Sequence, residues 1–174
     1  MERLLRISFV LTMLLPLPIS RSATAQTSRP TQDSNFGNFE ANVSRCTMNR
    51  HGTVQSCSRV QLTQRGPSGL RIRFSGPGEE PGSSTRVTFI ASHPSGEPAL
   101  SCDKGRCIPS IPAWSARVIS GSTAQFDVRG LPNNLPKAQS MRGTCRLSEK
   151  QISCQSQSRS CLLYTSDAAD ELRS

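Results

Sequence analysis

The stretch CRLSEKQISC (residues 145–154) carries the pattern on which the fold prediction rests. Its two cysteines enclose eight residues, an even number. An even gap places Cys145 and Cys154 directly opposite each other on one face of a two-stranded hairpin. In the same register Leu147 faces Ile152 on the cysteine side, which gives that face a small apolar patch. We therefore predict a hairpin closed by a disulfide between these cysteines.

Two further cysteine pairs have even gaps. Cys46 and Cys57 enclose ten residues, Cys102 and Cys107 enclose four, and a glycine suited to a tight turn lies in each gap. Opposed Cα atoms approach most closely at positions without ladder hydrogen bonds, and the first pair occupies such a position only if its loop has four residues, Arg50–Thr53. We predict that loop and local pairing of all six cysteines. Non-local pairing is the alternative, because six cysteines allow about 15 connectivities.

The first 25 residues have the features of an export signal. Arg3 and Arg6 supply the positive charge, residues 7–19 form a short apolar run, and Ala23 and Ala25 are the small residues that signal peptidase requires. The alternative, a membrane anchor, needs a longer apolar run. We predict cleavage after Ala25 and export to the periplasm or the medium of a bacterial cell, with no transmembrane segment left after cleavage.

The C-terminal residues have an unusual origin. The stretch CLLYTSDAADE (residues 161–171) matches the in-frame translation of a transposase adapter used to prepare sequencing libraries. We therefore predict that residues 161–174 are read-through and not natural, the alternative being a short natural acidic tail. Without them the cysteine count falls from seven to six, which suits an exported, disulfide-bonded domain.

Between the two ends, turn signals separate short segments of alternating polarity. Residues 26–38 are polar and are predicted to be a flexible arm, and residues 39–160 a single all-β domain. Besides the 102–107 and 145–154 hairpins, two more hairpins are predicted: 39–48 paired with 53–62, and 114–119 paired with 124–128 around Ser120-Gly121-Ser122. Two further strands are predicted at 70–74 and 87–91. Residues 108–112 are predicted to form a stiff link and residues 130–136 a loop. The predicted fold class is an all-β, disulfide-stapled antiparallel sandwich or barrel of about eight short strands and hairpins.

Motifs for catalysis or cofactor binding are missing from the sequence. It has no G-x-S-x-G, H-E-x-x-H, Walker or G-x-G-x-x-G motif, no C-x-x-C and only two histidines. His51 and His93 both lie in predicted turns or loops. We therefore predict no metal, no cofactor and no catalytic site, and keep an exported enzyme with a non-local active site as the alternative.

Basic residues provide the only positive functional signal. The net charge is +9, and within residues 26–160 arginine supplies 14 of the 17 basic residues. Arginine binds phosphate, sulfate and carboxylate groups with two parallel hydrogen bonds. The candidate anion-binding residues are Arg71, Arg73, Arg59, Arg86, Arg117 and Arg129. The alternative is a solvated sheet face whose charge prevents edge-to-edge pairing.

These observations predict an exported, non-enzymatic binding or envelope-structural module. Its partners would be anionic polysaccharide, lipopolysaccharide or the membrane surface, contacted through an arginine-bearing sheet face. Nucleic acid is disfavoured, because few aromatic residues are left over from the core to stack on bases. A minor alternative is a protease inhibitor that presents Lys104 and Arg106 on the Cys102–Cys107 loop.

Overall fold

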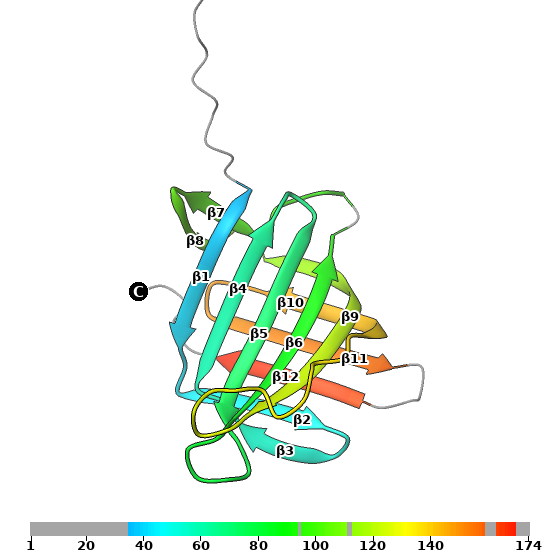
Figure 1. Cartoon of the computed structure of the whole chain (residues 1–174). Helices are drawn as coiled ribbons and strands as arrows, with labels where there is room; N and C mark the ends of the chain where they lie inside the picture. Colours follow the sequence, from blue (N-terminus) through cyan, green and yellow to red (C-terminus); the bar gives the residue numbers. More distant parts are fainter. Residues whose placement is uncertain (1–34, 94, 111–112, 159–162, 170–174) are drawn as a thin grey trace, which may run out of the picture.

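The computed structural model describes residues 35–93, 95–110, 113–158 and 163–169, and all of its regular elements are strands. The predicted signal peptide therefore lies outside the described residues, as does part of the predicted 108–112 link. Figure 1 shows the arrangement. In chain order the strands are β1 (Phe36–Asn42), β2 (Arg45–Arg50), β3 (Thr53–Ser56), β4 (Arg59–Arg65), β5 (Gly69–Pro77), β6 (Ser84–Ser92), β7 (Leu100–Asp103), β8 (Gly105–Pro109), β9 (Trp114–Phe126), β10 (Gln139–Leu147), β11 (Gln151–Ser158) and β12 (Leu163–Ala169).

The strands form one sheet in the order β3-β2-β12-β11-β10-β9-β6-β5-β4-β1-β8-β7. Neighbouring strands are antiparallel except β1 and β8, which pair in parallel. The predicted all-β class is confirmed. The predicted sandwich or barrel of about eight antiparallel strands is not, because the sheet is mixed, has twelve strands and is open between its edges β3 and β7.

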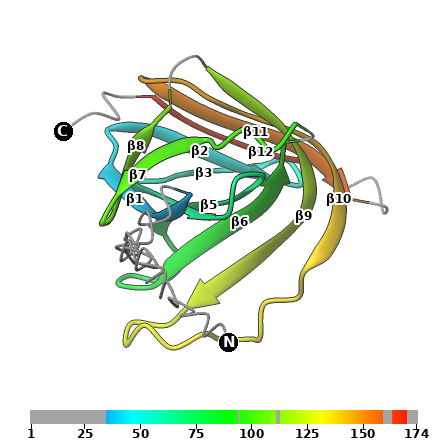
Figure 2. The ribbon, with the colours of Figure 1, turned by 90° about the horizontal axis from the view of Figure 1, so that it is seen from above.

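The sheet folds back over a single hydrophobic core. In Figure 1 the strands β4, β5 and β6 cross in front of β10, β11 and β12, and Figure 2 shows the two halves as separate layers. Side chains from both halves belong to one buried cluster, which includes Phe74 and Phe89 from the first half and Leu147 and Ile152 from the second. Buried positions alternate with partly exposed ones along β5 and β6, as a sheet with one covered face requires. Each strand therefore presents every second side chain on an outer face.

The predicted hairpin of residues 39–48 and 53–62 is divided into two pairs of strands. β1 pairs with β4, the ribbon bends at residues 43–44 and 57–58, and β2 then pairs with β3. Backbone hydrogen bonds from Val43 N to Ser58 O and from Cys57 N to Cys46 O, of 2.9 and 3.0 Å, hold the bend. The ribbon thus runs from one half of the sheet into the other. β1 begins at Phe36, within the segment predicted to be a flexible arm.

The predicted hairpin around Ser120-Gly121-Ser122 is wrong. These residues lie within β9, a single strand of 13 residues that continues through them. Gly121 is extended and packs closely, since a Cβ placed on it would lie 2.6 Å from Met141 Sδ. The register with β6 shifts by one residue near Ile119, so the strand bends there instead of reversing.

The three disulfides pair Cys46 with Cys57, Cys102 with Cys107 and Cys145 with Cys154, as predicted. The predicted four-residue loop is wrong, because Arg50 pairs with Thr53 and only His51 and Gly52 form the turn. Both turn residues have positive φ, 55° and 90°, which is typical of a type I′ turn. The shorter loop moves this cysteine pair to a hydrogen-bonded position, and its Cα atoms are 4.9 Å apart against 4.0 and 4.1 Å in the other two.

Three disulfides in one small β protein are typical of secreted proteins outside the reducing cytoplasm. None of the described residues belongs to a helix long and apolar enough to cross a membrane. The segment predicted to be adapter read-through supplies β12, which pairs with β11 on one side and β2 on the other. That prediction concerns the origin of the residues and stays a prediction.

Candidate anion-binding surface

Charge is distributed unevenly over the sheet. Six successive strands in the sheet order, β4, β5, β6, β9, β10 and β11, contain no Asp or Glu. Their positively charged residues are Arg59, Arg65, Arg71, Arg73, Arg86, Arg117, Arg142 and Arg146. These arginines alternate with the buried residues of their strands and so lie on the outer face, where acidic groups within the same strands do not compensate them.

Four of these residues form what we call the arginine cluster: Arg65, Arg71, Arg73 and Arg86. Arg71 and Arg73 alternate with the buried residues of β5 and share its outer face. Strand register brings in the other two. Arg73 is opposite Thr88 of β6, two residues from Arg86, and Arg71 is opposite Thr63 of β4, two residues from Arg65. Diagonal neighbours of this kind lie about 7–8 Å apart, within reach of long side chains.

Two members of the cluster have pKa values below the usual range for arginine. For Arg73, burial lowers the pKa most, followed by the positive charges of Arg86 and Arg65. For Arg71, burial again has the largest effect, followed by the charges of Arg73 and Arg65. Partial desolvation and mutual repulsion disfavour the charged side chains in the free protein. A bound anion relieves the repulsion, so the cluster is suited to binding one.

Polar contacts hold part of the cluster in place. Arg73 Nη1 donates a 2.9 Å hydrogen bond to Gln61 Oε1, and Gln61 Nε2 donates to Glu40 Oε2 at 3.2 Å. The guanidinium carbon of Arg86 lies 4.5 Å from the centre of the Phe126 ring, a cation–π contact. These contacts restrict the side chains but leave further N–H donors of both guanidiniums for a ligand.

A hollow of about 300 Å³ lies next to three of the clustered arginines. Thr88 and Ser122 add hydroxyl groups to its wall, and Pro136 closes one side from the loop between β9 and β10. The lining residues are Arg71, Arg73, Arg86, Thr88, Ile90, Ser120, Gly121, Ser122, Ala124, Phe126 and Pro136. Guanidinium and hydroxyl donors around one hollow suit a tetrahedral phosphate or sulfate group.

The structure separates the other predicted arginines from this group. Arg59 Nε lies 3.3 Å from Glu40 Oε1, so Arg59 is paired with a carboxylate. Arg129 lies in the loop after β9, where it pairs with Asp127 at 3.1 Å. Sequence reasoning missed Arg65, because the predicted strand ended at residue 62 whereas β4 continues to 65.

Arg117 belongs to a second group of basic residues. It is opposite Thr144 of β10, and the arginines two residues either side of Thr144 are Arg142 and Arg146. A larger, open hollow of about 750 Å³ is lined by Arg117 and Arg142 together with Ile119 and Thr144. This second group extends the basic character of the outer face past the bend in β9.

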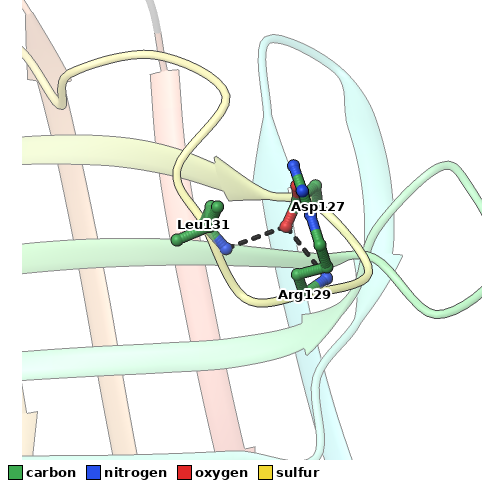
Figure 3. A network of polar contacts seen from close by, with 3 residues as sticks. All are labelled: Asp127, Arg129 and Leu131. Carbon is green, nitrogen blue, oxygen red and sulfur yellow. Dashed lines mark hydrogen bonds and ion pairs between the residues drawn. The ribbon is translucent and has the colours of Figure 1, made fainter.

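The loop after β9 begins with a compact polar network, shown in Figure 3. Asp127 Oδ1 accepts hydrogen bonds from the backbone N–H groups of Arg129 and Leu131, at 2.9 and 2.8 Å. The pKa of Asp127 is lowered, chiefly by the Leu131 bond, with the contacts to Arg129 acting in the same direction and partial burial opposing them. The network fixes the conformation of residues 127–131.

The residues considered for catalysis, metal binding or protease inhibition lie in or beside turns and loops. His51 forms a turn, while His93 stacks at 6.0 Å on Trp114 and its Nδ1 lies 2.7 Å from Ser95 Oγ. The described part of the chain contains no group of three His, Cys, Asp or Glu side chains placed to hold a metal. In the Cys102–Cys107 hairpin Lys104 and Gly105 form a two-residue turn and Arg106 directly follows it, so the proposed inhibitory residues do not lie on an extended loop of the kind a protease would need.

Comparison of the chain with protein-family models, with curated proteins and with solved structures finds no match. A function is therefore inferred from the geometry of the outer face.

Proposed function

We propose that this protein is an exported module that binds an anionic component of the cell surface through the arginine cluster. The ligand chemistry is a phosphate, sulfate or carboxylate group carried by a polysaccharide, lipopolysaccharide or membrane. The observation that carries the proposal is the convergence of Arg65, Arg71, Arg73 and Arg86 on one outer face, next to a hollow with hydroxyl groups. The export signal and the bacterial periplasm or medium belong to the same proposal.

Two features favour a binding role over a merely solvated surface. The cluster places like charges at diagonal positions, where they repel each other. Solubility alone does not require this repulsion, because scattered arginines would serve equally well. The carboxylate of Glu40 on β1 forms an ion pair with Arg59 and accepts a hydrogen bond from Gln61, so it does not neutralise Arg71 or Arg86. A polyanion would gain both Coulomb energy and counterion release.

Retention on immobilised heparin, a sulfated polysaccharide, tests the proposal. The variant Arg71→Ala with Arg73→Ala should elute at a clearly lower salt concentration than the unmodified protein. The slope of log affinity against log salt should fall by about two, since two ionic contacts are removed. The matched control is Arg45→Ala with Arg106→Ala, which removes the same charge from exposed positions on β2 and β8, outside the cluster.

The control variant should retain most of the binding. Equal shifts in the two double variants would show that only net charge matters, and would remove the cluster as the site. Failure of the unmodified protein to bind heparin at low salt would remove the proposed function.

A further inference from the structure

The loop between β9 and β10 exposes an unusual number of large apolar side chains. Val128, Leu131 and Leu135 are 65%, 53% and 85% exposed, and all three lie within eight residues. The other large apolar residues with high exposure are scattered, for example Val54 on β3 and Ile108 on β8. We call residues 127–138 the apolar loop. Exposed apolar groups gathered in one segment mark an interaction site more often than single exposed residues do.

The loop's own hydrogen bonds hold two of these side chains outward. Besides the bonds to Asp127 Oδ1, the backbone N–H of Asp127 donates to Leu131 O at 2.8 Å and that of Gly130 donates to Asp127 O at 2.9 Å. Gly130 has a φ of 78°, which lets the turn close. Because the turn is closed in this way, Val128 and Leu131 do not fold back onto the core. They are presented to the surroundings in a fixed arrangement.

The apolar loop lies beside the arginine cluster. Pro136 lines the same hollow as Arg71, Arg73 and Arg86, and Phe126, directly before the loop, lies under the Arg86 guanidinium. In Figure 1 the loop crosses in front of the lower ends of the strands β4 to β6, and Figure 2 places it on that same outer side. The apolar loop and the arginine cluster therefore lie on one side of the molecule.

We propose that this side of the protein binds the surface of a membrane that contains anionic phospholipids. The arginine cluster contacts the headgroup phosphates, and Val128, Leu131 and Leu135 enter the boundary between headgroups and acyl chains. This inference rests on the proposed function and names its ligand. Basic charge together with a few inserted apolar side chains is a recurrent means of reversible attachment to membranes.

The chemistry of the loop favours a lipid over a polysaccharide. Its exposed groups are aliphatic, and hydrocarbon chains are the environment into which leucine and valine transfer favourably. Sugar rings are generally recognised by hydrogen bonds and by the flat faces of aromatic rings, which Val128, Leu131 and Leu135 do not supply. A polysaccharide would use the arginines and leave these three side chains in water.

Co-sedimentation with lipid vesicles tests this inference. The oxidised protein should bind vesicles of phosphatidylglycerol and phosphatidylcholine and bind vesicles of phosphatidylcholine alone much more weakly. Leu131→Ser with Leu135→Ser should lower the partition coefficient at least about tenfold. The same variant should keep normal retention on heparin, because the arginine cluster is intact. The matched control, Val54→Ser with Ile108→Ser, removes two other exposed apolar groups, from β3 and β8, and should bind as the unmodified protein does.

The two proposals fail in different ways. A loop variant that binds the anionic vesicles as tightly as the unmodified protein would overturn the membrane inference. So would an unmodified protein that binds heparin but not these vesicles, and in that case the arginine cluster would remain an anion site for a polysaccharide. Weaker binding to both heparin and vesicles by Arg71→Ala with Arg73→Ala, beside weaker binding to vesicles alone in the loop variant, is the expected pattern.

Discussion

At the scale of single residues, two buried polar side chains illustrate opposite energetic roles. Gln64 is 1% exposed, and its side chain joins β4 to β7 through two hydrogen bonds with the backbone of Leu100, of 2.8 and 3.0 Å. Thr85 is equally buried, but its hydroxyl has no hydrogen-bond partner among the described residues. A buried polar group contributes to stability only when it is hydrogen-bonded.

We predict that Gln64→Leu lowers the free energy of unfolding by about 2–4 kcal/mol, because the N–H and C=O of Leu100 lose their partners in the core. The control Thr85→Val has nearly the same shape and should be neutral or stabilising by up to about 1 kcal/mol. Urea denaturation followed by circular dichroism measures both values. Equal destabilisation by the two changes would contradict this account.

Asp127 provides a prediction about pH. Its pKa is lower in the folded protein than the ordinary value of about 3.9, so the bonds to Leu131 and Arg129 contribute stability above that value. The contribution disappears as the pH falls through the lowered pKa. In an NMR titration, the carboxyl of Asp127 should have its midpoint below that of a model peptide. The amide signals of residues 129 and 131 should shift at the same pH.

The conservative variant Asp127→Asn separates charge from hydrogen bonding. Asn retains an oxygen that accepts from both backbone N–H groups, so the loop should keep its conformation, while the acid-dependent shift of these amides disappears. A midpoint for Asp127 at or above the peptide value would show that the network does not stabilise the ionised carboxylate.

At the scale of strands, β9 depends on the absence of a side chain at Gly121. A Cβ at this position would lie 2.6 Å from Met141 Sδ and 3.1 Å from Thr88 O. We predict that Gly121→Val lowers the free energy of unfolding by about 1–3 kcal/mol through overpacking. The cost of adding the valine should be smaller in a Met141→Ala background, since the sulfur atom is then gone. Strictly additive effects would contradict the proposed contact.

The strands show which sequence patterns predict structure correctly and which do not. Strict alternation predicted the regions now seen as β5 and β6, and even spacing with local turns predicted all three disulfides. A Ser-Gly-Ser segment, in contrast, is typical of a turn, and its role in a bent strand depends on contacts with β6 and β10. The bend between β1 and β2 was also missed, although the alternation changes phase there, since Val43 and Cys46 are both buried with two exposed residues between them.

For the candidate site, alternation placed Arg71 and Arg73 on one face, and the strand predicted at 87–91 begins directly after Arg86. Their proximity depends on strand order and register, which one sequence does not encode locally. The pairing of Arg59 with Glu40 was missed for the same reason, since 19 positions separate the two residues along the chain. Local pattern therefore identified the residue type and face, and tertiary pairing selected the members of the cluster.

At the scale of the whole molecule, continuity of the sheet depends on β12. Ala168 is buried and lies opposite Cys46 on one side and Ile152 on the other, and Gln151 Nε2 donates to the carboxylate of Asp167 at 3.1 and 3.2 Å. Without this strand, β2 and β11 would each have an unpaired edge. A strand in this position needs a small or apolar side chain opposite Cys46 and Ile152.

We predict that a chain ending at Ser160 loses protection of backbone amides in β2 and β11 against hydrogen exchange, because their ladder partners are removed. Its unfolding temperature should fall by several degrees, and exposed strand edges should promote association detectable by size-exclusion chromatography. The control is Asp167→Asn in the full chain, which keeps the backbone ladder and should retain protection. Unchanged exchange in the shortened chain would show that β12 does not contribute to the sheet in solution, whereas protection that is lost only in that chain would show that β2 and β11 depend on the strand between them.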